Sequence, residues 1–149
     1  MVSWPHMKTV TLENYRKDSL YPRIVRAVAG ILEKQREVAP VDVFAAMDFL
    51  QVRDLENWRA GRVLYLEKVI RCNLSKANRV LRILRFHAHD LNLEPVIRNY
   101  THKGKHQRVT LHFSKTAHPG VEEAYRRHFR VFEKTHIRSK KEIPYGSLT

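Results

Sequence analysis

The stretch from Leu66 to Leu93, LEKVIRCNLSKANRVLRILRFHAHDLNL, constrains the fold more than any other part of the chain. Wound as a helix at about 100° per residue, it gathers its apolar side chains on one arc and its cationic side chains on the opposite face. With Val69 and Val80 at its edge, the arc consists of Leu66, Ile70, Leu74, Ala77, Leu81, Leu84, Ala88 and Leu91. The basic face consists of Lys68, Arg71, Arg79, Arg82 and Arg85. The pattern predicts one amphipathic helix, or two helices placed end to end.

If there are two helices, the second begins near Asn73 or Ser75. Short polar side chains are favoured there because they accept a hydrogen bond from a free N–H group of the first helical turn. This division gives a helix over 65–71, a turn over 72–75 and a longer helix over 76–91.

Regular structure is also expected nearer the N-terminus. Asp18 or Ser19 is placed to cap a helix with Pro22 in its first turn, where a missing N–H group costs little. The apolar spacing carries this helix to about Glu37. Before it, the alternating residues 8–12 predict a short strand.

Two shorter helices are expected between these segments. Asp42 is placed to cap a helix over 43–50, and Asp54 is placed to cap another over 55–60. Gly61 follows the second helix at the position where glycine commonly ends one. Two short helices joined by a tight turn have the spacing of a helix-turn-helix.

The end of the second short helix, Trp58-Arg59-Ala60-Gly61-Arg62, resembles the corresponding segment of excisionase-like and related DNA-binding proteins. The resemblance implies a nucleic-acid surface that includes Arg59 and Arg62. Trp58 itself is expected in the core, and the alternative is an exposed ring that stacks on a base.

After Pro95 the apolar period changes from helical to two, which predicts strands. In the segment 107–114 apolar and polar residues alternate, and the segment 96–101 is expected to supply its partner strand. The residues between them, His102-Lys103-Gly104-Lys105-His106, form the expected hairpin tip, with Gly104 free to adopt a positive φ. Pro119 then opens a last helix that turns Tyr125, Phe129 and Phe132 inward.

These elements predict one domain over residues 1–132, followed by a basic, flexible tail over 133–149. The expected fold class is mainly α with one β-hairpin near 96–114, within the α+β class. A helix, a turn carrying Leu74-Ser75-Lys76, a longer helix and a basic hairpin, in that order from about Tyr65 to Ser114, resemble the winged helix-turn-helix superfamily. The resemblance implies a winged helix-like domain whose helix from Lys76 enters the major groove while the hairpin contacts the DNA backbone or the minor groove. The segment 113–126 also resembles small bacterial proteins of unassigned function, which implies no activity.

Net charge points to the class of partner. The chain has 28 Lys and Arg residues against 15 Asp and Glu residues, a net charge of +13, which favours a polyanion such as DNA, RNA or an anionic membrane surface. No apolar run is long enough to cross a bilayer and the N-terminus lacks a signal peptide, so we expect a cytoplasmic protein with no membrane partner. The candidate nucleic-acid contacts are Arg59, Arg62, Lys76, Arg79, Arg82, Arg85, Arg98, Lys103, Lys105 and Arg108.

Catalysis is a secondary expectation. His102, His106 and His112 could approach one another across the hairpin, where paired imidazoles beside Lys and Arg would suit a small ribonuclease. His87 and His89 point about 160° apart on a helix, so they do not form a chelating pair. We expect no metal and no cofactor.

The sequence therefore predicts a noncatalytic nucleic-acid-binding protein, with duplex DNA favoured by the order of helix and hairpin. Such a protein would be a transcription regulator or a DNA-associated accessory factor. One alternative is an RNA-binding protein or a small ribonuclease-like toxin or processing enzyme. Another is a protein-interaction subunit that docks an acidic partner. The oligomeric state stays open, a homodimer included.

Overall fold

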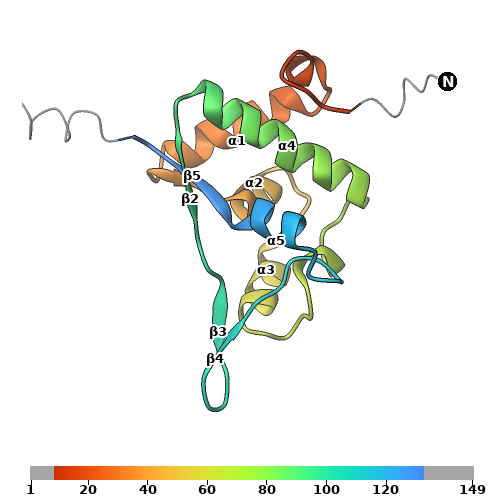
Figure 1. Ribbon diagram of the computed structural model, residues 1–149, viewed down its shortest axis with the longest axis vertical. Helices are drawn as coiled ribbons and strands as arrows, with labels where there is room; N and C mark the ends of the chain where they lie inside the picture. Colours follow the sequence, from red (N-terminus) through yellow and green to blue (C-terminus); the bar gives the residue numbers. More distant parts are fainter. Residues whose placement is uncertain (1–8, 133–149) are drawn as a thin grey trace, which may run out of the picture.

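A computed structural model describes residues 9–132 of the 149-residue chain, and the expected tail over 133–149 lies outside that range (Figure 1). Within these residues the fold is mixed α+β, with five α-helices, a three-stranded antiparallel sheet and a two-stranded hairpin. In chain order the elements are η2 (Tyr15–Lys17), α1 (Tyr21–Leu32), β1 (Glu37–Val38), α2 (Pro40–Ala46), α3 (Val52–Arg59), η3 (Leu66–Lys68), α4 (Leu74–Asp90), β2 (Glu94–Ile97), β3 (Thr101–Lys103), β4 (Arg108–Thr110), α5 (Pro119–Arg126) and β5 (Arg127–Arg130). No helix of the described part is long and apolar enough to cross a membrane.

Helix α1 has Pro22 in its first turn, as expected, and Asp18 accepts a hydrogen bond from the Leu20 amide just before it. The helix ends at Leu32, so the expectation that it reaches Glu37 was wrong. Residues 33–36 are all exposed and offer no apolar side chain that could hold a further turn against the core. The chain instead turns back, and Glu37 begins strand β1.

Helices α2 and α3 each begin before the aspartate expected to cap them. Asp42 and Asp54 lie inside the first turns, where a carboxylate favours the positive end of the helix dipole. Gly61 follows α3 with φ of 80°, the left-handed conformation that ends many helices.

The central amphipathic stretch is divided, as the two-helix alternative predicted. Asn73 caps α4, and its Oδ1 accepts the Lys76 amide at 2.7 Å. The part before the turn forms only the short 3-10 helix η3. Leu74 and Leu91 are 53% and 44% exposed, contrary to expectation, because they lie at the two ends of α4. Ile83 is fully buried on the inner face instead.

Strand pairing differs from the sequence-based expectation. The sheet order is β1-β5-β2, so β2, expected to be part of the hairpin, pairs with β5 instead. Strand β5 occupies residues expected to continue the last helix; Phe129 is buried from this strand, while Phe132 is 40% exposed. The hairpin consists of β3 and β4, with Thr101 opposite Thr110.

A strand was also expected over 8–12. The structure describes residues 9–12 of this segment, and they form no strand. The side chain of Asn14 holds this segment in a turn. Its Oδ1 accepts the Thr11 amide at 2.8 Å, and its Nδ2 donates to the Thr9 carbonyl at 3.0 Å. These local bonds replace those that a strand would have made.

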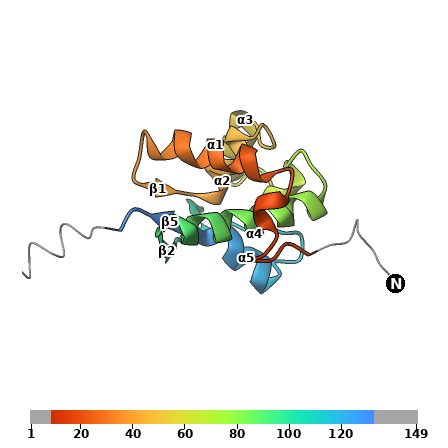
Figure 2. The same ribbon diagram turned by 90° about the horizontal axis from the view of Figure 1, so that it is seen from above.

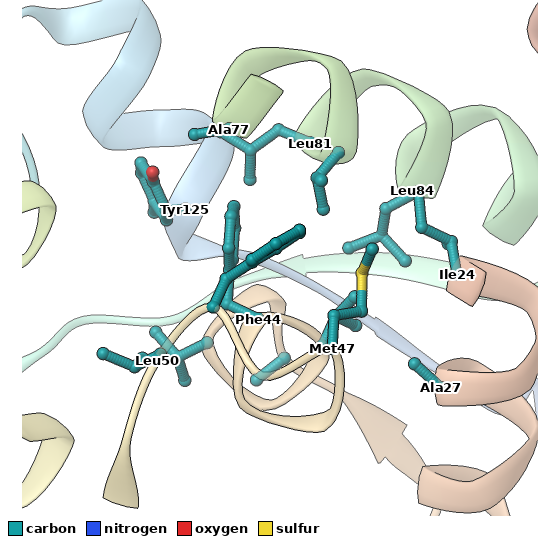
Figure 3. Close-up of a cluster of buried hydrophobic side chains, with 14 of the residues drawn as sticks. Ile24, Ala27, Phe44, Met47, Leu50, Ala77, Leu81, Leu84 and Tyr125 are labelled. Carbon is teal, nitrogen blue, oxygen red and sulfur yellow. The ribbon is translucent and has the colours of Figure 1, made fainter. Parts of the chain in front are cut away.

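The core lies between α1, α2, α4 and α5. Figure 3 shows Phe44 and Met47 of the α2 region facing Leu81 and Leu84 of α4. Seen from above, α1 and α4 lie side by side with η2 across one end (Figure 2). Trp58 is fully buried, as expected, and its Nε1 donates to the His112 carbonyl at 2.8 Å. This bond joins α3 to the segment that follows the hairpin.

Candidate nucleic-acid interface

The C-terminal end of α3 lies against the hairpin (Figure 1). A Cβ atom placed on Gly61 would lie 2.5 Å from Cε1 of His102, so the imidazole of β3 packs directly on the backbone at Gly61. A side chain at this position would be strained by the positive φ and would force the imidazole to shift. The contact fixes α3 and the hairpin as neighbours.

This arrangement brings together five of the ten predicted contact residues. We call them the hairpin surface: Arg59, Arg62, Lys103, Lys105 and Arg108. All five are exposed, and within residues 9–132 none forms an ion pair with a carboxylate. Arg62 donates to the Asn57 amide oxygen at 3.0 Å and Arg108 to the Thr101 hydroxyl at 2.8 Å, so neutral groups orient both guanidinium groups. Their positive charges remain uncompensated.

The turn of the hairpin depends on Gly104, though not through its φ. Contrary to expectation Gly104 does not adopt a positive φ. A Cβ atom there would lie 2.5 Å from the Gln107 carbonyl oxygen and 2.8 Å from Cγ2 of Val109. The Gly104 amide donates to that carbonyl at 2.9 Å, so the tight turn requires the absence of a side chain.

The base of the hairpin is anchored by a buried carboxylate. Glu122 of α5 is 3% exposed and accepts the amides of Phe113 and Ser114 and the Ser114 hydroxyl at 2.8–3.1 Å. Leu111 donates its amide to the Tyr100 carbonyl at 2.8 Å. These bonds fix the chain where it leaves β4.

The four predicted contacts on α4 lie on another surface, toward the end of the molecule opposite the hairpin (Figure 1). Arg79 forms a bidentate ion pair with Asp18, with distances of 2.6 and 3.0 Å. Burial alone would raise the pKa of the Asp18 carboxyl, but hydrogen bonds from Arg79 and from the Leu20 amide lower it below its usual range. Arg82 donates through Nε to the Val10 carbonyl at 2.7 Å. These two arginines therefore hold the N-terminal segment on α4.

Lys76 and Arg85 differ from those two arginines. Lys76 is half-buried, with Nζ 5.7 Å from the centre of the Phe49 ring, a cation–π arrangement. Arg85 is exposed and has no carboxylate partner among residues 9–132. Of the α4 set, Arg82 and Arg85 are therefore the exposed cations that no carboxylate among residues 9–132 neutralises, and Arg82 also bonds to the Val10 carbonyl.

Arg98 belongs to a polar network at the sheet. Its guanidinium group contacts both carboxylate oxygens of Glu37, at 2.6 and 3.0 Å. These hydrogen bonds lower the pKa of Glu37 to about 2, assisted by a hydrogen bond from His128. Tyr100 contacts the other ring nitrogen of His128 at 2.6 Å. Because Glu37 neutralises its charge, Arg98 contributes to the sheet more than to an external surface.

The histidines proposed for catalysis have separate environments. His102 packs on Gly61, while His106 is exposed in the hairpin turn. His112 is exposed and has Nδ1 3.9 Å from Oε1 of Glu122. Of the other pair, His87 is buried and His89 is exposed, so the two side chains face different environments on α4. Within the described residues, no three His, Cys, Asp or Glu side chains are grouped as metal ligands.

Sequence reasoning overlooked Glu122 and His128. Glu122 did carry a signal, because it lies three residues before the inward-facing Tyr125 and so on the apolar side of a predicted helix. His128 carried none, since its role depends on the pairing of β5 with β1 and β2.

Comparison with known proteins assigns no family to this site. No protein-family model, no curated protein and no solved structure matches the chain. The resemblances to excisionase-like and winged helix proteins therefore remain predictions, and the candidate site rests on its own geometry.

Proposed function

We propose that the protein binds nucleic acid through the hairpin surface, with duplex DNA as the preferred form. The observation that carries this proposal is the cluster of five exposed cations, without carboxylate partners among residues 9–132, where α3 meets the hairpin. Lys and Arg side chains neutralise backbone phosphates and release condensed counterions, which supplies affinity for any duplex. Neutral hydrogen-bond partners orient Arg62 and Arg108, so these two charges are held in place.

The order of the elements supports a winged helix-like mode of binding. Strand β2 leads into the hairpin, and β5 returns to pair between β1 and β2. The hairpin projects beyond the helical body, as a wing does when it contacts DNA beside a helix-turn-helix (Figure 1). Such a protein would act as a transcription regulator or a DNA-associated accessory factor.

Within this proposal α3 is a better groove-reading helix than α4. It follows α2 after a short turn, its C-terminal end touches the hairpin, and its exposed face carries Arg53 and Arg59. Two arginines of α4, by contrast, are engaged with Asp18 and the Val10 carbonyl. We therefore assign groove contact to α3 and the adjacent phosphates to the hairpin lysines.

The test is fluorescence anisotropy of labelled duplex DNA, duplex RNA and single strands over a salt series. The double variant Lys103→Ala/Lys105→Ala should bind duplex DNA more weakly. The plot of log K against log salt should become less steep, its slope smaller in magnitude by about 2. The matched control is Arg26→Ala/Lys34→Ala, which removes two exposed charges at and beyond helix α1. It should bind like the wild type.

Equal loss in both double variants would mean that only net charge matters and would contradict a defined hairpin surface. If the protein binds RNA more tightly than duplex DNA, RNA is the preferred ligand and the DNA preference is wrong. Each sample should also be run on a gel, since cleaved product would favour the ribonuclease alternative.

A further inference from the structure

A groove of about 1040 Å³ runs along α4, between the N-terminal segment on one side and α5 and β5 on the other. Its volume is at the upper end of the range for ligand pockets. In Figure 1, α4 lies toward one end of the long axis and the hairpin tip at the other. The groove is therefore a second surface, independent of the one proposed to bind nucleic acid.

The walls of the groove are held by specific contacts. The ion pair between Arg79 and Asp18 and the bond from Arg82 to the Val10 carbonyl attach the N-terminal wall to α4. On the opposite wall Arg127 pairs with Glu123 at 2.9 Å. The two carboxylates that line the groove are thus both neutralised.

Positive charge remains after these pairs are counted. Lys17, Arg82 and Arg85 line the groove, are exposed, and have no carboxylate partner within residues 9–132. Ser75 and Asn78 of α4 add exposed polar groups. Val121 of α5 contributes a half-buried apolar surface. A ligand for this groove must therefore combine negative charge with hydrogen-bonding groups and some aliphatic surface.

These features favour a peptide over a nucleic acid. Single strands bind by stacking bases on exposed aromatic rings, but Phe129, the aromatic residue that lines the groove, is only 5% exposed. The walls on both sides would also keep a duplex away from the floor.

We propose that this groove binds an acidic, aliphatic-containing peptide segment of a partner protein. Acidic side chains of the peptide pair with Arg85 and Lys17. Its backbone amides bond to Asn78 and Ser75, and an aliphatic side chain packs on Val121. Electrostatic complementarity of this kind sets the choice of partner more than it sets affinity.

The test begins with selection of random displayed peptides on the immobilised full chain. The enriched peptides should carry an excess of Asp and Glu. A synthetic, labelled version of the strongest should bind Arg85→Glu and Lys17→Glu at least about tenfold more weakly than the wild type. Arg26→Glu reverses an exposed charge outside the groove and is the matched control, expected to stay within about twofold.

Three results would overturn the proposal. The first is a selection without acidic enrichment, and the second is undiminished peptide binding by both groove variants. The third is displacement of the peptide by labelled oligothymidylate whose own binding also requires Arg85, which would make the groove a single-strand site. Circular dichroism of each variant checks that helix content is unchanged. Duplex binding by Arg85→Glu should match the wild type, so failure of one proposal is separable from failure of the other.

Discussion

The Nδ1 atom of His128 lies 2.6 Å from Oε2 of Glu37, a residue 91 positions earlier in the chain. The opposite ring nitrogen lies 2.6 Å from the Tyr100 hydroxyl. A neutral imidazole satisfies both contacts if Nδ1–H donates to the carboxylate and the tyrosine donates to Nε2. The network thus joins β1 and β5 to the segment that enters the hairpin.

The first prediction is that the free energy of unfolding decreases as the pH falls. Burial lowers the pKa of His128 below its ordinary 6.5, so from pH 6.5 downward the unfolded chain binds more protons than the folded one. Glu37 acts in the same direction below its ordinary 4.5, because Arg98 holds its pKa at about 2. Urea unfolding over a pH series measures the effect.

In His128→Gln the loss of stability that begins near pH 6.5 should be reduced. Part of this loss of stability should remain in the variant, because burial also lowers the pKa of His87. In Glu37→Gln the loss between 4.5 and about 2 should be reduced. An unchanged pH profile in His128→Gln would contradict a neutral, buried imidazole.

The second prediction concerns Glu122. Glu122→Ala should lower the free energy of unfolding by about 3 kcal/mol, because the buried amides of Phe113 and Ser114 lose their acceptor. Glu122→Gln keeps one acceptor oxygen and should cost less. The neighbouring Glu123→Ala is the control for denaturant unfolding and should stay within about 0.5 kcal/mol, since Glu123 is exposed. Similar values for Glu122→Ala and Glu123→Ala would show that the buried bonds contribute nothing.

The third prediction concerns His87, whose buried Nδ1 has no hydrogen-bond partner. His87→Leu removes this unsatisfied group and should raise the free energy of unfolding by about 1 kcal/mol. The ring also packs edge-on against Tyr21 at 5.7 Å, which a leucine replaces with apolar contact. His89→Leu, at an exposed position of the same helix, should have little effect. Clear destabilisation by His87→Leu would mean that the ring contact outweighs the unpaired nitrogen.

The fourth prediction separates two arginines that the sequence had placed in one class. Arg79→Ala should lower stability by about 1 kcal/mol, because Asp18 loses its partner, and should leave duplex affinity unchanged. Arg59→Ala should weaken DNA binding and leave the free energy of unfolding unchanged. Its plot of log K against log salt should have a slope smaller in magnitude by about 1. Thermal unfolding measures the stability of each variant, and fluorescence anisotropy on the same samples measures its affinity for duplex DNA. Weaker DNA binding by Arg79→Ala would contradict this assignment and would indicate that α4 contacts the DNA.

The helices could be predicted because their signals are local. Apolar spacing, Pro22, Asn73 and Gly61 each act within a turn or two of where they stand, and the structure has helix boundaries near all of them. The sheet could not be predicted, since β5 pairs with strands from two distant parts of the chain. Regular alternation suggested the hairpin, and also a strand over 8–12 that does not form within residues 9–12.

The same distinction applies to the candidate site. Arg79 and Arg98 each meet their carboxylate 61 positions away, so no local pattern indicated that their charges are neutralised. The hairpin residues Lys103 and Lys105 sit in a short turn that the sequence did identify. Their proximity to Arg59 follows from the packing of His102 on Gly61, which is not encoded in any motif.

The packing of His102 on Gly61 also affects which substitutions the hairpin surface can tolerate over evolution. Any side chain at position 61 would require a strained left-handed backbone and a shift of the His102 imidazole. The lysines and arginines of the hairpin surface are exposed and have no such packing constraint. The contact between α3 and the hairpin does have one, because the His102 imidazole fills the space that a side chain at position 61 would take.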